Sequence, residues 1–533
     1  MSNLPCGIWL LDKIGCCSGY NTKARNITFK WLIFILTFVT YAAFHASRKP
    51  ISVVKNVLNQ DCDGHTPPPG VNATADPHWC DWQPFVGVDS NTLLGFLDSS
   101  YLFSYAVAMF FSGMLADRMD LRYFMTAGML FSASFTAAFG LAYFWKIHSL
   151  TYFIAVQIAC GAFQASGWPG VVTVMGNWNG KGKRGLIFGI WNSHTSVGNI
   201  LGSLMASAFV DNLWGLSFIV PGAFLALVGV IDFFFLTPYP SEAGCDPPEQ
   251  AYGSTECRHV GAVAASASAD ELAELIDQGS PSEESGSETD VSSRLGEDAA
   301  KQPDDPPTAQ EEAAISFFRA LRIPGVLPFA ICLFFAKLVS YTFLYWLPRY
   351  LHSAAKYSPS QSANLSTLFD MGGIVGGILA GLANDWTGAP GIVCVCLLII
   401  AIPMMFVYQA VATYSHMLNM LLLVVVGLLV NGPYALITTA VSADLGTSLR
   451  GNAKALATVT SIIDGTGSVG AALGPLLAGA ASSGDNWTGV FVILMCSDAI
   501  AVVSLGWVLR REMRAISRRR REGQSCTAVE DTA

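Results

Sequence analysis

The sequence predicts an all-α polytopic membrane protein whose twelve transmembrane helices form two related halves of six. Its composition, with 52% hydrophobic and 13% charged residues and a mean hydropathy of +0.44, is too apolar for an ordinary soluble protein. Twelve apolar stretches are long enough to cross about 30 Å of hydrocarbon. None of them alternates apolar and polar residues with a period of two, so we expect helices rather than the strands of a barrel.

The predicted helices follow one another without a cleavable signal peptide before the first. We place them approximately at residues 28–48, 93–114, 122–145, 150–176, 185–209, 216–237, 326–348, 362–384, 390–410, 417–441, 455–480 and 488–509.

An acidic insert separates the first six helices from the last six. Between Tyr239 and Glu312 the chain carries 18 acidic and 3 basic residues, a net charge of -15, so the rest carries +6 of the total of -9. Such a Ser-, Pro- and Glu-rich segment buries too little apolar surface to fold. The predicted organisation is a cytosolic N-terminus at 1–27, a six-helix bundle at 28–237, a disordered acidic cytosolic linker at 238–313, a second bundle at 314–509 and a basic cytosolic tail at 510–533.

The Lys and Arg residues near helix ends predict the orientation. With a cytosolic N-terminus, only four basic residues lie on the other side, namely Lys55, Lys146, Arg349 and Lys356. We therefore expect both termini in the cytosol and the loop at 56–91 in a lumen or outside.

The loop at 56–91 contains two signals of an oxidising, glycosylating compartment. Asn72-Ala-Thr74 is a glycosylation sequon. Cys62 and Cys80 could form a disulfide, and two unpaired thiols are the alternative. The other eleven cysteines are interpreted as apolar filler or cytosolic thiols, and no metal site is expected.

The two halves are related in sequence, as in transporters built from repeats. Asn192-Ser-His-Thr-Ser-Val-Gly-Asn-Ile-Leu-Gly-Ser-Leu-Met-Ala206 matches Asp464-Gly-Thr-Gly-Ser-Val-Gly-Ala-Ala-Leu-Gly-Pro-Leu-Leu-Ala478 at an offset of 272, which is 464 minus 192. The fifth helix therefore pairs with the eleventh. The small residues of these motifs favour close helix packing.

Cations inside the apolar stretches are the strongest functional signal. Arg48 and Lys49 lie in the first apolar run, and Lys337 lies in the middle of the seventh. A cation at bilayer depth costs at least about 2.5–3.5 kcal/mol, so such residues face a protein interior or a watery cavity. We interpret them as a site for an anion. Lys49 points about 100° away from Arg48 on a helix, so we expect it to snorkel or to pair locally.

The loop after the second helix resembles the signature loop of the major facilitator superfamily. It reads Gly113-Met-Leu-Ala-Asp-Arg118 and is followed by Arg122. The resemblance implies the 6+6 pseudo-twofold fold of that superfamily. It also implies that Asp117, Arg118 and Arg122 act as a gate latch rather than as a substrate site.

Longer motifs resemble the animal sugar-phosphate exchangers, which belong with the organophosphate:phosphate antiporters. The resemblance covers nearly all helices and stops at the 56–91 loop, the acidic insert and the tails. The motifs are Ser47-Arg-Lys-Pro-Ile-Ser52, Gly167-Trp-Pro169, Gly180-Lys-Gly-Lys-Arg-Gly185, Trp191-Asn-Ser-His-Thr-Ser-Val-Gly-Asn199, Phe335-Ala-Lys-Leu-Val-Ser-Tyr341, Asn431-Gly-Pro-Tyr434 and Ile463-Asp-Gly-Thr-Gly467.

This resemblance places Arg48 where the bacterial antiporters of the family carry a phosphate-binding arginine in helix 1. A guanidinium can bind a phosphate monoester dianion through two hydrogen bonds. Lys337, on the counterpart helix 7, is the candidate second cation. The chain departs from the bacterial pattern at two positions, because the helix 7 arginine falls on Ser340 and the helix 2 lysine falls on Met109.

Further site residues follow from the same motifs. His194 lies at the position of the substrate-site histidine of the bacterial relatives, and a structural role is its alternative. The remaining candidates, which could bond sugar hydroxyls or phosphate oxygens, are Asn192, Tyr41, Tyr341 and Tyr345.

Three carboxylates in the predicted spans bear on the mechanism. Asp98, Asp370 and Asp464 are costly unless paired, so each either carries a proton or balances a buried cation. We favour charge balance. If one of them pairs with Lys337, the anion site shrinks to Arg48 and His194.

The resemblance implies an antiporter that exchanges a sugar phosphate for inorganic phosphate across the endoplasmic reticulum membrane. Glucose 6-phosphate is the first candidate for the sugar phosphate. A proton-coupled symporter for an organic anion or sugar and a non-transporting receptor are the alternatives. No enzyme signature, cofactor or nucleic-acid partner is expected. Contact with membrane lipid and function as a monomer are expected, with a dimer as the alternative.

Overall fold

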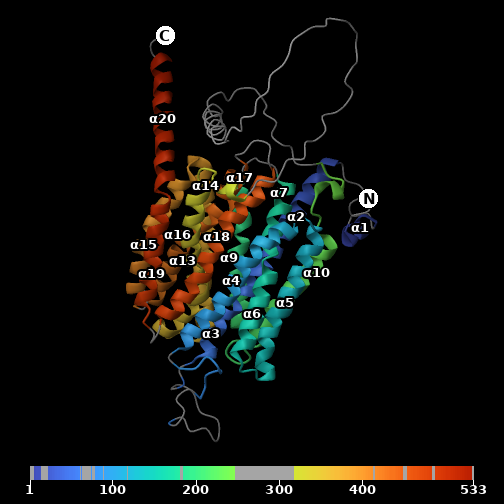
Figure 1. Cartoon of the computed structure of the whole chain (residues 1–533), viewed down its shortest axis with the longest axis vertical. Coiled ribbons are helices and arrows are strands. Elements are labelled where there is room, and N and C mark those ends of the chain that lie inside the picture. Colours follow the sequence, from blue (N-terminus) through green and yellow to red (C-terminus); the bar gives the residue numbers. More distant parts are fainter. Residues whose placement is uncertain are drawn as a thin grey trace, which may run out of the picture. The chain divides into compact units, whose positions relative to one another are not determined.

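The computed structural model of the chain describes residues 5–13, 22–60, 62, 74, 79–87, 89–116, 118–179, 184–246, 317–411, 414–447, 453–482 and 486–530. Within these ranges every regular element is a helix (Figure 1). The molecule has two ends. We call the end that carries Cys62 and Cys80 the loop end, and the opposite end, from which the last helix projects, the tail end.

The described part of the first half forms ten α-helices and one short 3-10 helix. In order they are α1 (Cys6–Lys13), α2 (Thr22–Arg48), α3 (Pro50–Leu58), α4 (Ser90–Ala116), α5 (Leu121–Trp145), α6 (Leu150–Gln164), α7 (Gly167–Trp178), α8 (Arg184–Asn192), α9 (His194–Ser207), α10 (Leu216–Phe235) and η2 (Pro240–Ala243).

The second half repeats the pattern of long helices. In order its helices are α12 (Phe317–Leu321), α13 (Val326–Ala355), α14 (Pro359–Thr387), α15 (Pro390–Val411), α16 (His416–Leu436), η3 (Ile437–Val441), α17 (Ser442–Thr447), α18 (Ala453–Ala481), α19 (Thr488–Ser504) and α20 (Gly506–Glu530).

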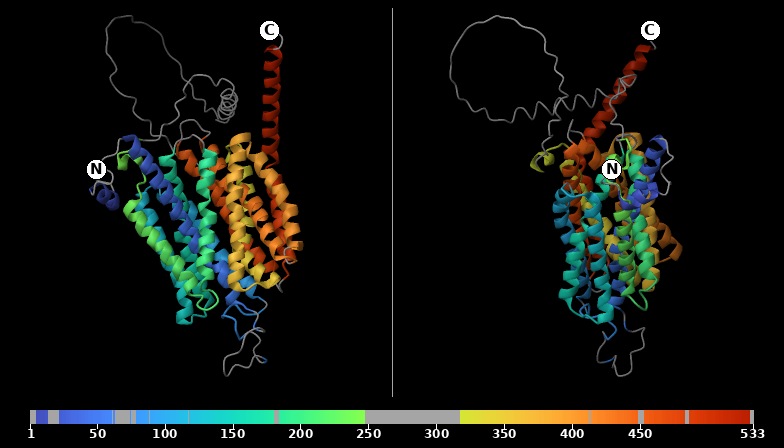
Figure 2. Two further views of the ribbon diagram at one scale, coloured as in Figure 1. Left: turned by 180° about the vertical axis from the view of Figure 1, so that it is seen from behind. Right: turned by 90° about the vertical axis from the view of Figure 1, so that its right-hand side faces the viewer.

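The two sets of helices lie side by side, as the blue-to-green and yellow-to-red ribbons of Figure 2 show. Between them α4 packs on α18 and α9 packs on α14, while α3 contacts α13 near the loop end. These helices therefore enclose the centre of the molecule.

Glycines in the repeated motif allow two helices to pack closely, and they do so in the same way in both halves. A Cβ on Gly198 or Gly202 of α9 would collide with the backbone of Ala42 or Ala46 in α2. Their counterparts in α18, Gly470 and Gly474, would collide with Phe334 and Leu338 of α13. Close packing thus accounts for these glycines, and it makes α2 the structural counterpart of α13.

Prolines inside helices leave carbonyls without a helical hydrogen bond, and donors from neighbouring helices bind two of these carbonyls. Pro169 has no N–H for the Ala165 carbonyl, which accepts a hydrogen bond of 2.8 Å from Ser112 Oγ of α4. Pro348, inside α13, likewise leaves the Leu344 carbonyl to an outside donor. Pro50 begins α3 at its first turn, where a missing N–H is tolerated.

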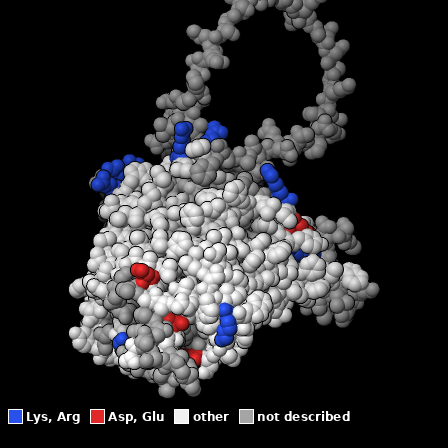
Figure 3. Space-filling view, turned by 60° about the horizontal axis from the view of Figure 1, so that its bottom comes forward, with Lys and Arg blue, Asp and Glu red and all other residues white. Residues whose placement is uncertain are grey.

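Nine helices of the described residues are long and apolar enough to span a membrane, or ten when α19 and α20 count as one bent span. The other two predicted spans coincide with α8–α9 and α18, which are rich in Gly, Ser and Thr. The exact number of twelve stays a prediction. Figure 3 shows a broad uncharged surface between charged groups near the two ends, as a lipid-facing belt requires.

The structure differs from the expectation at the first span, because the helical segment continues to Leu58 instead of ending at residue 48. Lys55 is therefore fully buried in α3 and does not lie in the loop. Polar residues after Pro50 masked this extension in the sequence.

In the loop itself Cys62 and Cys80 form a disulfide with Cα atoms 5.7 Å apart. Asn72 and nearly all of the acidic linker lie outside the described residues, so the glycosylation site and the linker stay predictions.

Candidate functional site

Arg48 lies at the end of α2, in the middle of the molecule, and only 4% of its surface is exposed. Its Nε donates a hydrogen bond of 2.6 Å to Gln164 Oε1 of α6, and Gln164 in turn donates to Ser47 Oγ at 2.7 Å. The guanidinium lies over the rings of Tyr105 at 4.8 Å and Tyr41 at 5.8 Å. Its NH2 group is buried without a hydrogen-bond partner. A buried guanidinium nitrogen that lacks an acceptor is what an anion site needs.

Lys337 lies on α13 and is 3% exposed. Its Nζ forms an ion pair of 2.7 Å with Asp464 Oδ1 of α18 and lies 3.4 Å from Ser468 Oγ. Gly467 lies alongside the lysine, and a Cβ there would come within 2.9 Å of Lys337 Cδ. Lys337 is therefore a compensated charge in this structure. The candidate anion site therefore loses Lys337. This is the outcome that we expected for the case in which a carboxylate pairs with this lysine.

The two cations approach one another from opposite halves. Tyr105 of α4 and His45 of α2 each lie within electrostatic range of both Arg48 and Lys337. On the other side, Tyr341 and Tyr434 lie under the Lys337 ammonium, with ring centroids 6.0 and 5.6 Å from Nζ.

The helix contacts show which residues are counterparts. The pairs Ala42 with Phe334 and Ala46 with Leu338 share an offset of 292, so Arg48 corresponds to Ser340 and His45 corresponds to Lys337. The hydrogen bond of Arg48 to Gln164 also has its equivalent, because Ser340 Oγ donates to Asn431 Oδ1 at 2.7 Å. At this pair of positions a guanidinium is thus present in one half only.

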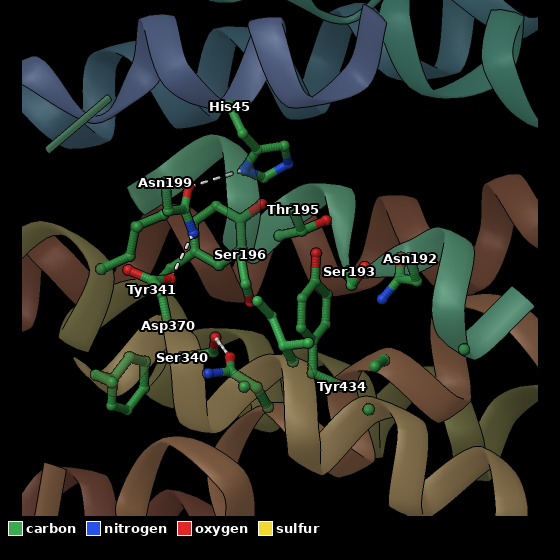
Figure 4. A pocket seen from close by; sticks show the side chains of 18 residues that line it. His45, Asn192, Ser193, Thr195, Ser196, Asn199, Ser340, Tyr341, Asp370 and Tyr434 are labelled. Carbon is green, nitrogen blue, oxygen red and sulfur yellow. Dashed lines mark hydrogen bonds between the residues drawn. The ribbon is translucent and has the colours of Figure 1, made fainter. Parts of the chain in front are cut away.

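A pocket lies between the two halves and is lined by residues of both. We call it the central pocket. Its polar lining comes from α2, α8, α9, α13, α14 and α16 (Figure 4). The polar residues shown there are His45, Asn192, Ser193, Thr195, Ser196, Asn199, Ser340, Tyr341, Asp370 and Tyr434.

A second pocket, with about 300 Å³ of empty space, borders Arg48 itself. Ser47, Tyr101, Gln157 and Tyr345 contribute its polar groups. The Tyr345 hydroxyl has no hydrogen-bond partner. Arg48 therefore borders a small pocket that polar side chains line.

The structure distributes the remaining predicted residues unequally. Asn192 and Tyr341 line the central pocket, Tyr345 lines the second pocket and Tyr41 lies under Arg48. His194 lines neither of these pockets. It is fully buried beside the rings of Trp191 and Tyr41, at centroid distances of 4.5 and 4.8 Å, and contacts Thr195 Oγ1 through Nδ1 at 3.2 Å. Its substrate role stays a prediction.

Three residues at or beside the pockets were missed in the sequence, namely His45, Asn199 and Gln164. His45 Nδ1 lies 3.1 Å from Asn199 Oδ1, and Gln164 holds Arg48. Asn199 and the preceding motif were noticed only as a family signature. Gln164 carried a detectable signal, because it is one of two amide side chains in the otherwise apolar α6 and such a group is costly unless it is paired.

Lys49 does not snorkel, and this expectation was wrong. It is 2% exposed, and its Nζ donates a hydrogen bond of 2.9 Å to the Leu344 carbonyl that Pro348 leaves free. The lysine turns inward because a carbonyl without a helical partner accepts strongly from an ammonium. The contact joins the two halves.

Lys49 is one of several residues that fasten α3 to α13 at the loop end. Lys55 forms a buried ion pair with Asp98 and donates to the Tyr345 carbonyl at 3.1 Å. Arg349 NH1 donates to the Asn59 carbonyl at 2.7 Å. We call these contacts the loop-end clasp. Asp98 therefore balances a cation. Its partner is Lys55, which we had expected on the luminal or outer side of the membrane.

The clasp should hold the loop end closed. Replacing Lys49 by Met removes a charge-assisted bond, so we expect the open state to become about 10-fold more populated. The measurement is the rate at which a membrane-impermeant thiol reagent, added at the loop end, labels Ile51→Cys beside the second pocket. Lys356→Met, which changes an exposed lysine at the same end, is the matched control. Equal labelling of both variants would contradict a sealing role for Lys49.

The predicted gate latch is only partly described. Asp117 lies outside the described residues, Arg118 is exposed, and Arg122 NH2 lies 3.9 Å from Asp120 Oδ2. Its role as a latch stays a prediction.

Comparisons with known proteins agree with this architecture. Residues 33–461 match the family model described as Major Facilitator Superfamily. The chain is 48% identical over 519 residues to the glucose-6-phosphate exchanger SLC37A2 of Homo sapiens, covering 96% of this chain and 97% of that protein. It is 42% identical to the putative glycerol-3-phosphate transporter 1 of Arabidopsis thaliana, covering 100% and 96%.

A solved structure has a similar fold. It is that of a bacterial homolog of the human lysosomal transporter Spinster in an inward-facing, unoccupied conformation, with a TM-score of 0.53 and 15% identity over 92% of this chain and 97% of that one.

Proposed function

Because the chain belongs to the major facilitator superfamily and, within it, to the family of the glucose-6-phosphate exchangers, we propose that it exchanges a sugar phosphate for inorganic phosphate by alternating access. Glucose 6-phosphate is the first candidate substrate. The observation that carries the proposal is the buried Arg48, whose NH2 group has no partner and which borders a polar pocket.

Electrostatics supports exchange rather than one-way transport. The described charges around the centre are Arg48, the ion pair of Lys337 with Asp464, and Lys49 in electrostatic range of Asp370, so Arg48 is the cation without a carboxylate partner and the sum is +1. Closing an empty pocket over that cation removes it from water without a counterion, which is costly. A bound phosphate removes this cost, so the loaded carrier should change state readily and the empty carrier should not.

Two of the three candidate carboxylates support this proposal over a proton-coupled symporter. Asp98 and Asp464 are held by Lys55 and Lys337, so each serves charge balance in this structure. We further propose that the protein works as a monomer in the endoplasmic reticulum membrane with both termini in the cytosol. The described basic residues Lys23, Arg25, Arg319 and Arg322 at the tail end agree with this orientation.

Exchange is tested in proteoliposomes that contain the purified protein. We expect uptake of labelled phosphate to rise at least about 10-fold when the vesicles are loaded with phosphate or glucose 6-phosphate. The reason is that the carrier changes between its two states at low free-energy cost only when a phosphate is bound. Vesicles loaded with glucose are the control. Equal uptake into loaded and empty vesicles would refute obligatory exchange.

A further inference from the structure

Asp370 has an unsatisfied carboxylate oxygen in the wall of the central pocket. The residue lies on α14 and is 3% exposed. Its Oδ1 accepts a hydrogen bond of 2.8 Å from Asn199 Nδ2, while its Oδ2 is buried without a partner. A buried carboxylate that keeps one oxygen unpaired is costly unless a ligand supplies a donor.

The neighbouring cation does not satisfy this oxygen. Lys49 lies within electrostatic range of Asp370, but its Nζ donates to the Leu344 carbonyl. Asp370 therefore differs from Asp98 and Asp464, each of which pairs with a lysine.

Asp370 belongs to a polar chain that crosses from one half to the other. Figure 4 shows His45, Asn199 and Asp370 joined by two hydrogen bonds, with Asn192 lying apart from them. Asn199 presents its oxygen to His45 and its nitrogen to Asp370, which fixes the carboxylate in one orientation. The free oxygen is thus held in place before a ligand arrives.

The charges in the pocket wall separate two kinds of ligand group. Asp370 is the one Asp, Glu, Lys or Arg among the described residues that line the central pocket, whereas Arg48 lines the second pocket. A carboxylate repels a phosphate dianion and accepts hydrogen bonds from hydroxyl groups. Ser340 and Asn431, which are hydrogen-bonded to each other, offer further polar groups to a polyol in the same pocket.

We propose that Asp370, held by Asn199, binds the hydroxyl groups of the sugar part of the substrate, while the phosphate end lies toward Arg48. This proposal rests on the proposed function and deepens it. Inorganic phosphate has no carbon-bound hydroxyl group, so its exchange does not use Asp370. The residue thereby makes the carrier selective among phosphate monoesters.

The test is counterflow with Asp370→Asn. Asparagine has the same shape and can still accept from Asn199, but it loses the charge that strengthens hydrogen bonds from hydroxyl groups. In vesicles loaded with phosphate we expect the KM for glucose 6-phosphate to rise about 10- to 100-fold. Exchange of phosphate for phosphate and of methyl phosphate for phosphate should stay within about 2-fold of wild type, because neither ligand has a carbon-bound hydroxyl group that could reach Asp370 while its phosphate lies toward Arg48. Asp211→Asn, at an exposed position, is the matched control.

Two results would overturn the inference. One is an equal loss of phosphate, methyl phosphate and glucose 6-phosphate exchange in Asp370→Asn, which would indicate a structural carboxylate. The other is restoration of glucose 6-phosphate exchange by adding Lys49→Met, which would show that Asp370 only balances that lysine. If wild-type protein exchanges no phosphate at all, the proposed function itself fails, which is a different outcome.

Discussion

Replacing Arg48 by Ala is expected to reduce phosphate exchange at least about 100-fold. Two charge-assisted hydrogen bonds to a phosphate are each worth about 1.5–3 kcal/mol, and about 1.4 kcal/mol corresponds to tenfold. No second guanidinium substitutes for it, because its counterpart in the other half is Ser340. The measurement is counterflow of labelled phosphate into vesicles loaded with phosphate.

A graded series separates the charge of Arg48 from its shape. Arg48→Lys keeps a cation but loses the planar fork and the bond from Nε to Gln164, so we expect activity between those of wild type and Arg48→Ala. Arg319→Ala, on an exposed helix outside the pockets, is the matched control and should transport normally. Wild-type exchange by folded Arg48→Ala would rule out Arg48 as the phosphate ligand.

The sequence was sufficient to find the helices and the principal cation. Long apolar runs predict spans because length and hydropathy alone decide them, and Arg48 stands out as a charge that a lipid-facing position would not tolerate. The same reasoning failed for Lys55. It follows Pro50, where a helix can restart, and its buried position depends on Asp98 and on the Tyr345 carbonyl, which lie far away in the sequence.

The sequence repeat alone did not show which residues of α2 correspond to which residues of α13. The fifth and eleventh helices match at an offset of 272, whereas α2 and α13 pair at 292, because the first half carries the long loop before α4. No single ungapped alignment contains both offsets. The glycine contacts between helices were needed to show that Ser340 is the counterpart of Arg48 and that Lys337 is the counterpart of His45.

The sequence pointed to His194 and missed His45, because the packing of the helices decides which histidine borders a pocket. The predicted fifth helix is broken, because α8 ends at Asn192 and α9 begins at His194. Helical periodicity gives the face on which His194 lies, but it does not show which neighbouring helices cover that face. In the structure it is His45 that borders the central pocket.

The second large effect is expected at the ion pair of Lys337 with Asp464. Removing one member leaves the other charge buried alone, which typically costs about 3–5 kcal/mol, so both Lys337→Met and Asp464→Leu should unfold at markedly lower temperature than wild type. The double variant replaces the pair by apolar groups of similar size and should regain most of that stability. Thermal unfolding of the three purified variants in detergent measures this.

Transport by the same variants tests whether Lys337 binds phosphate directly. In Lys337→Met the unpaired Asp464 repels the phosphate dianion, so we expect exchange to be lost. In the double variant this repulsion is absent and Arg48 remains, so exchange should return to within about tenfold of wild type. A stable double variant that is as inactive as Lys337→Met would show the opposite, namely that the ammonium leaves Asp464 to contact the phosphate. Since Lys337 lies within electrostatic range of Tyr105, close to Arg48, the double variant decides between a site with one cation and a site with two.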